Sequence, residues 1–158
     1  MTADPDEVAA TLSAAAARVI ATESLRLTDG LETGGILLGT SSGNLIEVRH
    51  AGDPGPLAQR GTHTFNRDLD HAQHLAEAAW VEDQSLWIGE WHTHPTGDLT
   101  PSPLDLDSYL RHLHDPDLDF DHFVAMIVGL DTQARPIIVT WLIERHQARP
   151  IPLRSARD

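Results

Sequence analysis

The sequence predicts one domain in which helices pack against a mixed β-sheet, an α/β or α+β sandwich. Its 158 residues are enough for a single well-buried core. Its apolar content of 41% is that of an ordinary globular protein. Short apolar segments typical of strands alternate along the chain with segments of helical spacing, which is the element order of a sheet covered by helices.

The N-terminal third predicts a helix followed by a β-hairpin. Asp4-Pro5 opens an alanine-rich stretch that runs to about Leu25, and a proline in the first turn is typical of a helix start. Residues 34–40 (GGILLGT) and 45–50 (LIEVRH) have the composition of strands. The Ser-Ser-Gly-Asn sequence between them predicts the turn of the hairpin.

The middle of the chain predicts a loop, a helix and a strand. Residues 53–59 hold two prolines and a glycine and form the loop, and 62–65 could add a short strand. Apolar residues at helical spacing predict a helix over 68–83. The apolar segment 86–92 (LWIGEWH) then predicts a strand.

The C-terminal third predicts a loop, a helix and two strands. Residues 95–103 are polar and rich in proline, and 104–113 have helical spacing. The apolar runs 121–130 and 136–144 predict strands. The tail is weakly specified, although 150–153 could add an edge strand.

Composition limits the possible functions. The absence of cysteine excludes disulfides, thiolate zinc sites and cysteine nucleophiles, so a metal would need histidine and carboxylate ligands. The net charge of −13 argues against a nucleic-acid binder, and it fits a basic protein partner or simple solubility equally well. No apolar run is long enough for a membrane span, and the acidic N-terminus lacks the pattern of a secretion signal. We therefore expect a cytoplasmic protein.

Residues 88–105 (IGEWHTHPTGDLTPSPLD) carry the densest set of metal-binding side chains. His92 and His94 stand two apart at the end of a predicted strand, so both imidazoles can face one ion. The loop that follows leads to Asp105, which can supply a third ligand. Three such ligands leave the fourth tetrahedral position to water, as in catalytic zinc sites, where the water can lose a proton near neutral pH.

The chain has ten histidines, so other pairs need the same scrutiny. His112 and His114 lie toward the end of a predicted helix, where their side chains point about 200° apart. We interpret them as surface residues favourably placed near a helix C-terminus. His71 and His74 are three apart on another helix, but no carboxylate with a supporting loop follows them, so a metal role has little support.

Two further candidates have structural explanations of equal or greater weight. Ser102, Pro103 and Asp105 form a capping-box-like helix start, which the spacing supports as well as a metal site, and the two roles can coexist. Glu32 precedes a glycine-flanked strand, where a glutamate is usually a solvated strand end. The Gly34-Gly35 pair (GG of GGILLG) indicates close backbone approach or a turn.

Taken together, these residues resemble the JAMM (MPN-plus) zinc metalloprotease family. The family pattern is a glutamate before a glycine-containing strand, then His-Ser/Thr-His, seven residues, Ser, two residues and Asp. The chain has Glu32, His92-Thr93-His94, Ser102 and Asp105 at that spacing. The flanking sequences GGILLG and IGEWHTHP look like the compact prokaryotic branch, whose members include deubiquitinase-like enzymes.

The resemblance implies a fold, a metal and a reaction. The fold would be a cytidine-deaminase-like α/β sandwich, one domain over residues 1–158 with its core at about 8–145. Zn²⁺ would be held by His92, His94 and Asp105. Glu32 would accept the proton of the attacking water and pass it to the leaving amine, and Ser102 would hydrogen-bond the oxyanion. The reaction would be hydrolysis of a peptide or isopeptide bond after the C-terminal glycine of a ubiquitin-like protein.

The resemblance also implies partners. We expect a bacterial deconjugase acting on a ubiquitin-like protein or its conjugates, with activating and conjugating enzymes encoded in the same operon, including anti-phage defence operons. The chain has little room for the two insertions that set linkage preference in larger relatives, so that preference should be weak. The Gly-Gly tail would add as a strand to an exposed sheet edge. Trp91 and Phe65 could line its groove, although core packing is the simpler explanation for both.

Three alternatives differ in substrate or class. One keeps the chemistry but trims the C-terminus of a sulfur-carrier protein. Another is a non-catalytic scaffold, against which the intact five-residue motif argues. The third is nucleic-acid deamination, which the cytidine-deaminase-like fold suggests, but the chain lacks the P-C-x-x-C cysteines that this reaction requires.

Overall fold

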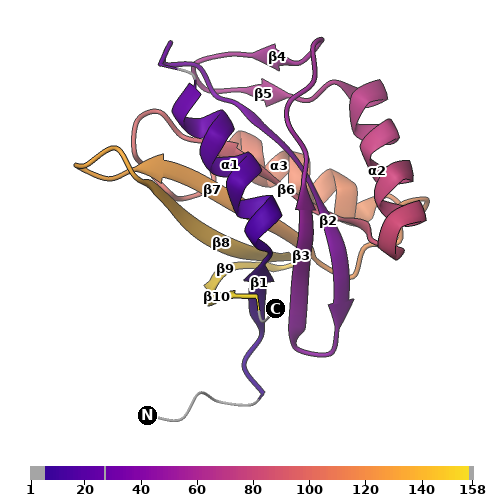
Figure 1. The fold of residues 1–158 in the computed structure, drawn as a ribbon. Coiled ribbons are helices and arrows are strands. Elements are labelled where there is room, and N and C mark those ends of the chain that lie inside the picture. The colour runs from indigo at the N-terminus through magenta and orange to yellow at the C-terminus, as the bar shows by residue number, and fades with distance from the viewer. Residues whose placement is uncertain (1–5, 27, 157–158) are drawn as a thin grey trace.

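The computed structural model describes residues 6–26 and 28–156, and these form a three-layer arrangement around one large mixed sheet (Figure 1). Three helices accompany ten strands in the described ranges. The helices are α1 (Ala14–Arg26), α2 (Leu69–Asp83) and α3 (Pro103–His114). The strands are β1 (Ala9–Leu12), β2 (Gly34–Ser42), β3 (Leu45–Ala51), β4 (Gln59–Arg60), β5 (Phe65–Asn66), β6 (Leu86–Thr93), β7 (Phe123–Leu130), β8 (Pro136–Glu144), β9 (Gln147–Ile151) and β10 (Leu153–Ser155).

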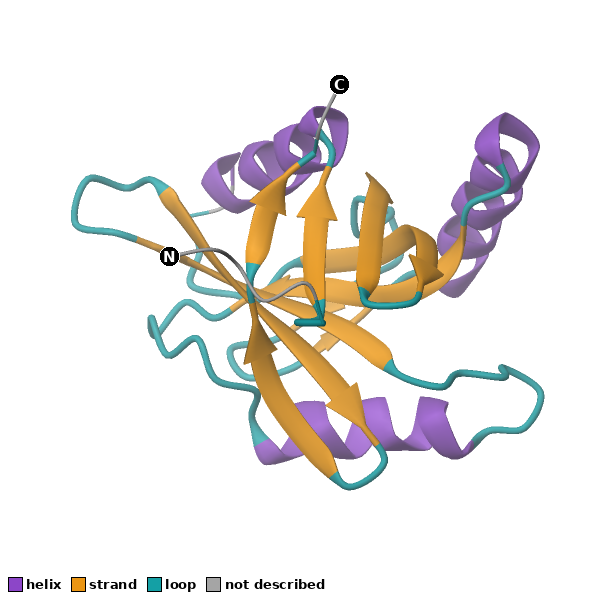
Figure 2. Ribbon diagram, turned by 90° about the horizontal axis from the view of Figure 1, so that it is seen from below, coloured by secondary structure: helices purple, strands orange, loops and turns teal. Residues whose placement is uncertain are grey.

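The large sheet has the strand order β10-β1-β3-β2-β6-β7-β8-β9, and β4 and β5 form a separate two-stranded sheet. β6 pairs antiparallel with β2 and parallel with β7, so both kinds of ladder meet at the centre. The edge strands of the large sheet, β9 and β10, are separated in the chain only by Pro152, so the two edges of this sheet come together (Figure 2). The predicted mixed sheet with helices packed against it is confirmed.

The two faces of the sheet are covered by different helices. Ala16 and Ile20 of α1 pack on one face, in a core that includes Trp91 and Met126. On the other face, α3 packs against Phe123 and neighbouring residues, and α2 packs against Ile36 and Leu38 of β2. Figure 1 shows α1 in front of the sheet and α3 behind it. Alternate residues of β7 enter the two cores because successive strand side chains point to opposite faces.

The predicted N-terminal helix is wrong in its first half. Ala9 and Ala10 are buried in β1, which lies between β3 and β10 in parallel pairing, and the helix begins only at Ala14. The hydroxyl of Ser13 accepts a hydrogen bond from Ala16 N–H at 3.1 Å, which is a helix cap. Alanine favours helix locally, but the sheet contacts prevail. The Asp4-Pro5 start lies outside the described residues.

The other elements agree with the sequence prediction more closely. The helices α2 and α3 match their predicted ranges within one residue, and α3 carries both hydrogen bonds of a capping box at Ser102. The short strand expected at 62–65 is instead the pair β4 and β5, with the turn between them. The tail forms two edge strands where one was expected. No helix within the described ranges has the length and apolar character needed to span a membrane.

Candidate metal centre

The end of β6 and the start of α3 bring the two histidines and the aspartate together. His92 is the penultimate residue of β6, and His94 follows the strand, held by a 2.9 Å hydrogen bond from its N–H to the carbonyl of Val128 in β7. The two residues are 4% and 8% exposed and share one face of the strand. Asp105 lies in the first turn of α3 and faces them.

Three ligand atoms form a nearly equilateral triangle. Nε2 of His92 lies 2.9 Å from Nε2 of His94, and Oδ2 of Asp105 lies 3.2 and 3.1 Å from them, respectively. Ligands of a tetrahedral zinc ion with bonds of about 2.05 Å stand about 3.3 Å apart. The spacing therefore fits one small divalent cation bound by all three groups.

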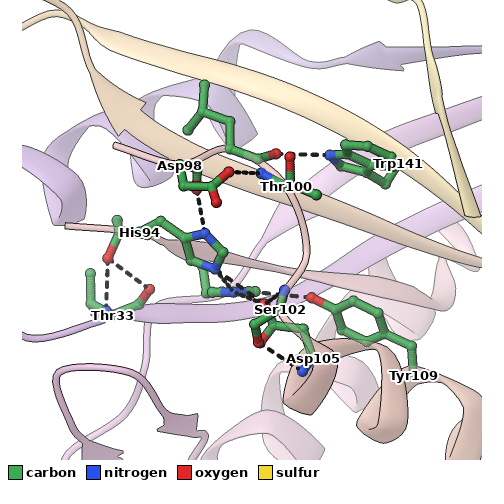
Figure 3. A network of polar contacts seen from close by, with 11 residues as sticks. Thr33, His94, Asp98, Thr100, Ser102, Asp105, Tyr109 and Trp141 are labelled. Atoms are coloured by element: carbon green, nitrogen blue, oxygen red, sulfur yellow. Dashed lines mark hydrogen bonds and ion pairs between the residues drawn. The ribbon is translucent and has the colours of Figure 1, made fainter. Parts of the chain in front are cut away.

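Both imidazoles are oriented through their other ring nitrogen. Nδ1 of His94 lies 2.5 Å from the carbonyl of Asp98 (Figure 3). Nδ1 of His92 lies 3.4 Å from the hydroxyl of Tyr109. Proton donation from Nδ1 leaves Nε2 free to ligate, as is usual for metal-bound histidine. Tyr109 was not among the residues predicted from the sequence, although it stands four residues after Asp105 and so shares its helix face.

Asp105 takes part in the helix cap and in the histidine cluster at once. Its N–H donates to Oγ of Ser102 at 3.1 Å, and its Oδ2 accepts from the N–H of Ser102 at 2.8 Å. Burial opposes ionisation of Asp105, but His92 and His94, which donate from Nε2 only while no cation is bound, and the N–H of Ser102 outweigh it and hold the pKa of this carboxyl far below its usual range. The carboxylate is therefore ionised and available to a cation.

Glu32 is the fourth ionisable group at the centre. One of its carboxylate oxygens lies within 4.8 Å of ring nitrogens of His92 and His94, which makes Glu32 a wider alternative to Asp105 as a ligand. Burial raises the pKa of Glu32, while the two histidines partly offset this effect. Its Oε1 is buried and has no hydrogen-bond partner among the described residues. A buried carboxylate oxygen of this kind calls for a water molecule or a cation.

The glycines after Glu32 allow β2 to approach its neighbours. A Cβ on Gly34 would lie 2.2 Å from the carbonyl oxygen of Trp91, and one on Gly35 would lie 2.0 Å from that of Gly52. Gly34 is paired with His92 in the β2–β6 ladder. The close approach indicated by the Gly-Gly pair thus brings Glu32 beside the histidines.

A cavity of about 160 Å³ opens beside the cluster. Its lining includes Glu32, His92 and Asp105 together with His63 of the β4–β5 turn and Phe65 of β5. Phe65 is half-buried and lines this cavity, although core packing was the simpler expectation for it. Trp91 does not line the cavity: it is fully buried on the opposite face of β6, where its indole N–H donates to the carbonyl of Gly52 at 2.9 Å.

The remaining histidine predictions are tested by their surroundings. His112 is half-buried, stacks on Phe123 with ring centroids 5.4 Å apart, and so is not the predicted surface residue, whereas His114 is exposed. The helix turns His112 toward the sheet, where aromatic side chains cover it. His71 pairs with Asp53 away from the centre, and His74 is exposed.

Comparison with known proteins identifies the family of the chain. Residues 4–144 match the family model described as prokaryotic homologs of the JAB domain. A Pseudomonas aeruginosa protein named CD-NTase/cGAS isopeptidase is 35% identical over 100 residues, which cover 62% of this chain and 63% of that protein. An Enterobacter hormaechei protein of the same name is 32% identical over 128 residues, covering 78% and 69%.

A solved structure supports the fold independently. The solution structure of a Desulfitobacterium hafniense protein superimposes with a TM-score of 0.69 at 20% identity and covers 94% of both chains. The matched region of the chain spans less than two thirds of the Pseudomonas relative. The family match covers residues 4–144, which is most of the sequence. The chain therefore belongs to the prokaryotic homologs of the JAB domain.

Proposed function

We propose that the protein is a zinc-dependent isopeptidase that hydrolyses the bond after the C-terminal glycine of a ubiquitin-like protein. The observation that carries the proposal is the triangle of His92, His94 and Asp105 ligand atoms with buried Glu32 beside it. The relatives named isopeptidases support a deconjugating role. The fit of this donor set to zinc supports the metal, because two imidazoles and a carboxylate form an open catalytic site.

In this proposal His92, His94 and Asp105 hold Zn²⁺. The bound metal supplies an acidified water molecule and polarises the scissile carbonyl. The unpartnered Oε1 of Glu32 is the group on this chain that such a water would satisfy. The raised pKa of Glu32 suits this carboxylate to accept a proton and donate it again, since an efficient general base has a pKa near the working pH.

The remaining steps use side chains of the chain. Glu32 accepts the proton of water as the water oxygen bonds to the carbonyl carbon. Ser102 donates its hydroxyl proton as a hydrogen bond to the carbonyl oxygen as charge develops there. Its hydroxyl oxygen already accepts from Asp105 N–H, which leaves the proton free for this donation. The carbon–nitrogen bond then breaks, and Glu32 transfers its proton to the leaving amine.

The names of the relatives suggest the target side of the substrate. We propose that the conjugate joins a ubiquitin-like protein to a CD-NTase or cGAS-type nucleotidyltransferase, in a cytoplasmic anti-phage system with activating and conjugating enzymes as partners. Nucleic acid plays no part in recognition, because the acidic chain would repel its phosphates.

The docking place proposed for the glycine tail is the β4–β5 sheet. The large sheet has its edges at β9 and β10, whereas the centre lies at β6 in its middle. In the described part of the chain no third strand pairs with the edges of the two-stranded β4–β5 sheet, and Phe65 of β5 lines the cavity beside Glu32. An extended tail can add to such an edge by main-chain hydrogen bonds.

The test is zinc-dependent cleavage of a panel of fusions and conjugates. Ubiquitin-like proteins, including any encoded beside the gene, would be joined through the terminal glycine to a reporter or to a lysine of a CD-NTase. Cleavage after glycine by the wild type and none by Glu32→Ala would support the proposal. Zinc binding with cleavage only of a sulfur-carrier fusion would replace the substrate class. Absence of zinc binding would instead indicate a scaffold.

A further inference from the structure

Arg60, the last residue of β4, is anchored to the segment that carries Glu32. Its Nε donates to the carbonyl of Glu32 at 2.9 Å, and its Nη2 donates to the carbonyl of Leu31 at 3.2 Å. Nη1 and Nη2 also lie 3.0 Å from the two carboxylate oxygens of Asp29. The Arg60 side chain is only 18% exposed and its bonds to the two carbonyls are partly buried, whereas the Asp29 carboxylate is 43% exposed.

The next residue holds the other side of Glu32. The carbonyl of Gly61 accepts a 2.8 Å hydrogen bond from the N–H of Glu32. Glu32 precedes β2, which begins at Gly34, so the main ladder of the sheet does not fix its peptide groups. Two consecutive residues, Arg60 and Gly61, therefore hold both the N–H and the C=O of Glu32.

This backbone attachment matters because the Glu32 carboxylate has so little to orient it. Its Oε1 has no hydrogen-bond partner among the described side chains and backbone groups. The position of the carboxylate beside His92 and His94 then depends on where the backbone holds Cα. A displacement of about 1 Å can cost about 100-fold in rate when geometry is a main source of catalysis.

We propose that Arg60 is a positioning residue that holds Glu32 at the geometry needed for proton transfer. The inference rests on the proposed function of Glu32 and adds a residue outside the five-residue motif. Arginine suits the role because its planar guanidinium serves two carbonyls and a carboxylate at once, whereas a lysine ammonium is a compact point charge. Asp29 fixes the guanidinium in turn, and it lies on the same loop as Glu32.

The experiment compares Arg60→Ala and Arg60→Lys with a matched control. Arg149→Ala removes another arginine that is paired with a carboxylate, Glu144 at 3.4 Å, on the distant strand β9. For each protein, kcat and KM are measured on the cleaved substrate, together with zinc content and thermal midpoint. Hydrogen exchange at the Glu32 amide is followed by NMR, with the amide of Ala125 in β7 as an internal reference for the core.

The expected result is a loss in kcat of about 10- to 100-fold for Arg60→Ala, with KM changed by no more than about twofold. Zinc content stays at the wild-type value, and the Glu32 amide exchanges at least about tenfold faster while Ala125 is unchanged. Arg60→Lys recovers only part of kcat. Added guanidinium ion, at concentrations that leave the wild type unaffected, restores part of kcat in Arg60→Ala and none in Glu32→Ala.

Two outcomes would overturn the inference. One is an unchanged kcat and unchanged Glu32 exchange in Arg60→Ala. The other is a loss of zinc or of global stability that accounts for the whole loss of rate, with no guanidinium rescue, because Arg60 would then be a structural anchor only. If the wild type cleaves no substrate, the proposed function fails, and the Glu32 exchange still decides whether Arg60 holds this backbone.

Discussion

Ser102 and Asp105 are joined by two reciprocal hydrogen bonds at the N-terminus of α3, and the Asp105 oxygen in this pair also faces the histidines. Oδ2 of Asp105 accepts the N–H of Ser102 at 2.8 Å while lying 3.1 Å from Nε2 of His94. Oδ2 of Asp105 is therefore both a hydrogen-bond acceptor in the capping box and the candidate metal-ligand atom. Formation of the helix start orients the carboxylate, so the cap prepares the site before a cation arrives.

The dual role of Ser102 can be separated with two substitutions. Replacing a serine cap by alanine costs about 1 kcal/mol, whereas glycine costs only a few tenths. We expect Ser102→Ala to lower both stability and turnover, and Ser102→Gly to lower turnover by about 100-fold with a much smaller loss of stability. Urea unfolding and kcat measured on both variants test this. Equal turnover in wild type and Ser102→Gly would remove Ser102 from the chemistry.

Asp105 should contribute to metal affinity, and Asp107 provides its control on the same helix. Asp107 is exposed and forms an i,i+4 pair with Arg111. We expect Asp105→Ala to weaken zinc binding by at least about tenfold and Asp107→Ala to leave it unchanged, because only Asp105 faces the histidines. Competition with a coloured chelator measures both affinities. Full zinc affinity in Asp105→Ala would return Asp105 to a capping role alone.

Glu32→Gln should keep zinc and lose turnover by about a thousandfold, since the amide cannot accept a proton. Its control is Glu144→Gln, which removes a half-exposed carboxylate far from the centre. Because burial raises the pKa of Glu32, the ionised group destabilises the zinc-free fold as pH rises through that pKa. The zinc-free Glu32→Gln variant should therefore be more stable than the wild type at neutral pH. Kinetics test the loss of turnover, zinc content tests the retained metal, and urea unfolding tests the stability. Turnover of Glu32→Gln at the wild-type level would exclude Glu32 as the base.

His112 should make the fold sensitive to acid. Burial, with Arg67 and Arg111 nearby, lowers the pKa of His112 to about 4 from the usual 6.5. Between these two pH values the unfolded chain binds a proton at His112 and the folded chain does not. This contribution to stability is present above about pH 6.5 and is lost as the pH falls toward 4, by at most about 3 kcal/mol. His112→Gln should flatten the pH dependence of the free energy of unfolding between pH 7.5 and 4.5.

The neighbouring His114 supplies the comparison for this effect. It is exposed on the same helix, so His114→Gln should follow the wild-type pH dependence. The measurement uses zinc-free protein, because protonation of metal ligands adds its own pH dependence when zinc is bound. Parallel curves for His112→Gln and the wild type would show that burial of His112 does not control acid stability.

Local signals were sufficient for some elements and misleading for others. The α3 helix matched its prediction because Ser102, Pro103 and Asp105 specify its start within one turn. The prediction for the first half of the N-terminal helix was wrong because the alanines of β1 pair with β3 and β10, which are remote in sequence. The prediction that His112 lies on the surface was wrong because its environment depends on how α3 packs on the sheet, which the local sequence does not specify.

By itself, the sequence determined the donor types, their spacing along β6 and α3, and the cap that orients Asp105. Only the tertiary structure decided which groups meet. Glu32 reaches His92 because β2 and β6 pair antiparallel with Gly34 opposite His92, and Arg60 reaches Glu32 because β4 lies against the same loop. Strand pairing and loop packing between distant segments are set by burial and hydrogen bonding of the whole chain, which no short sequence pattern contains.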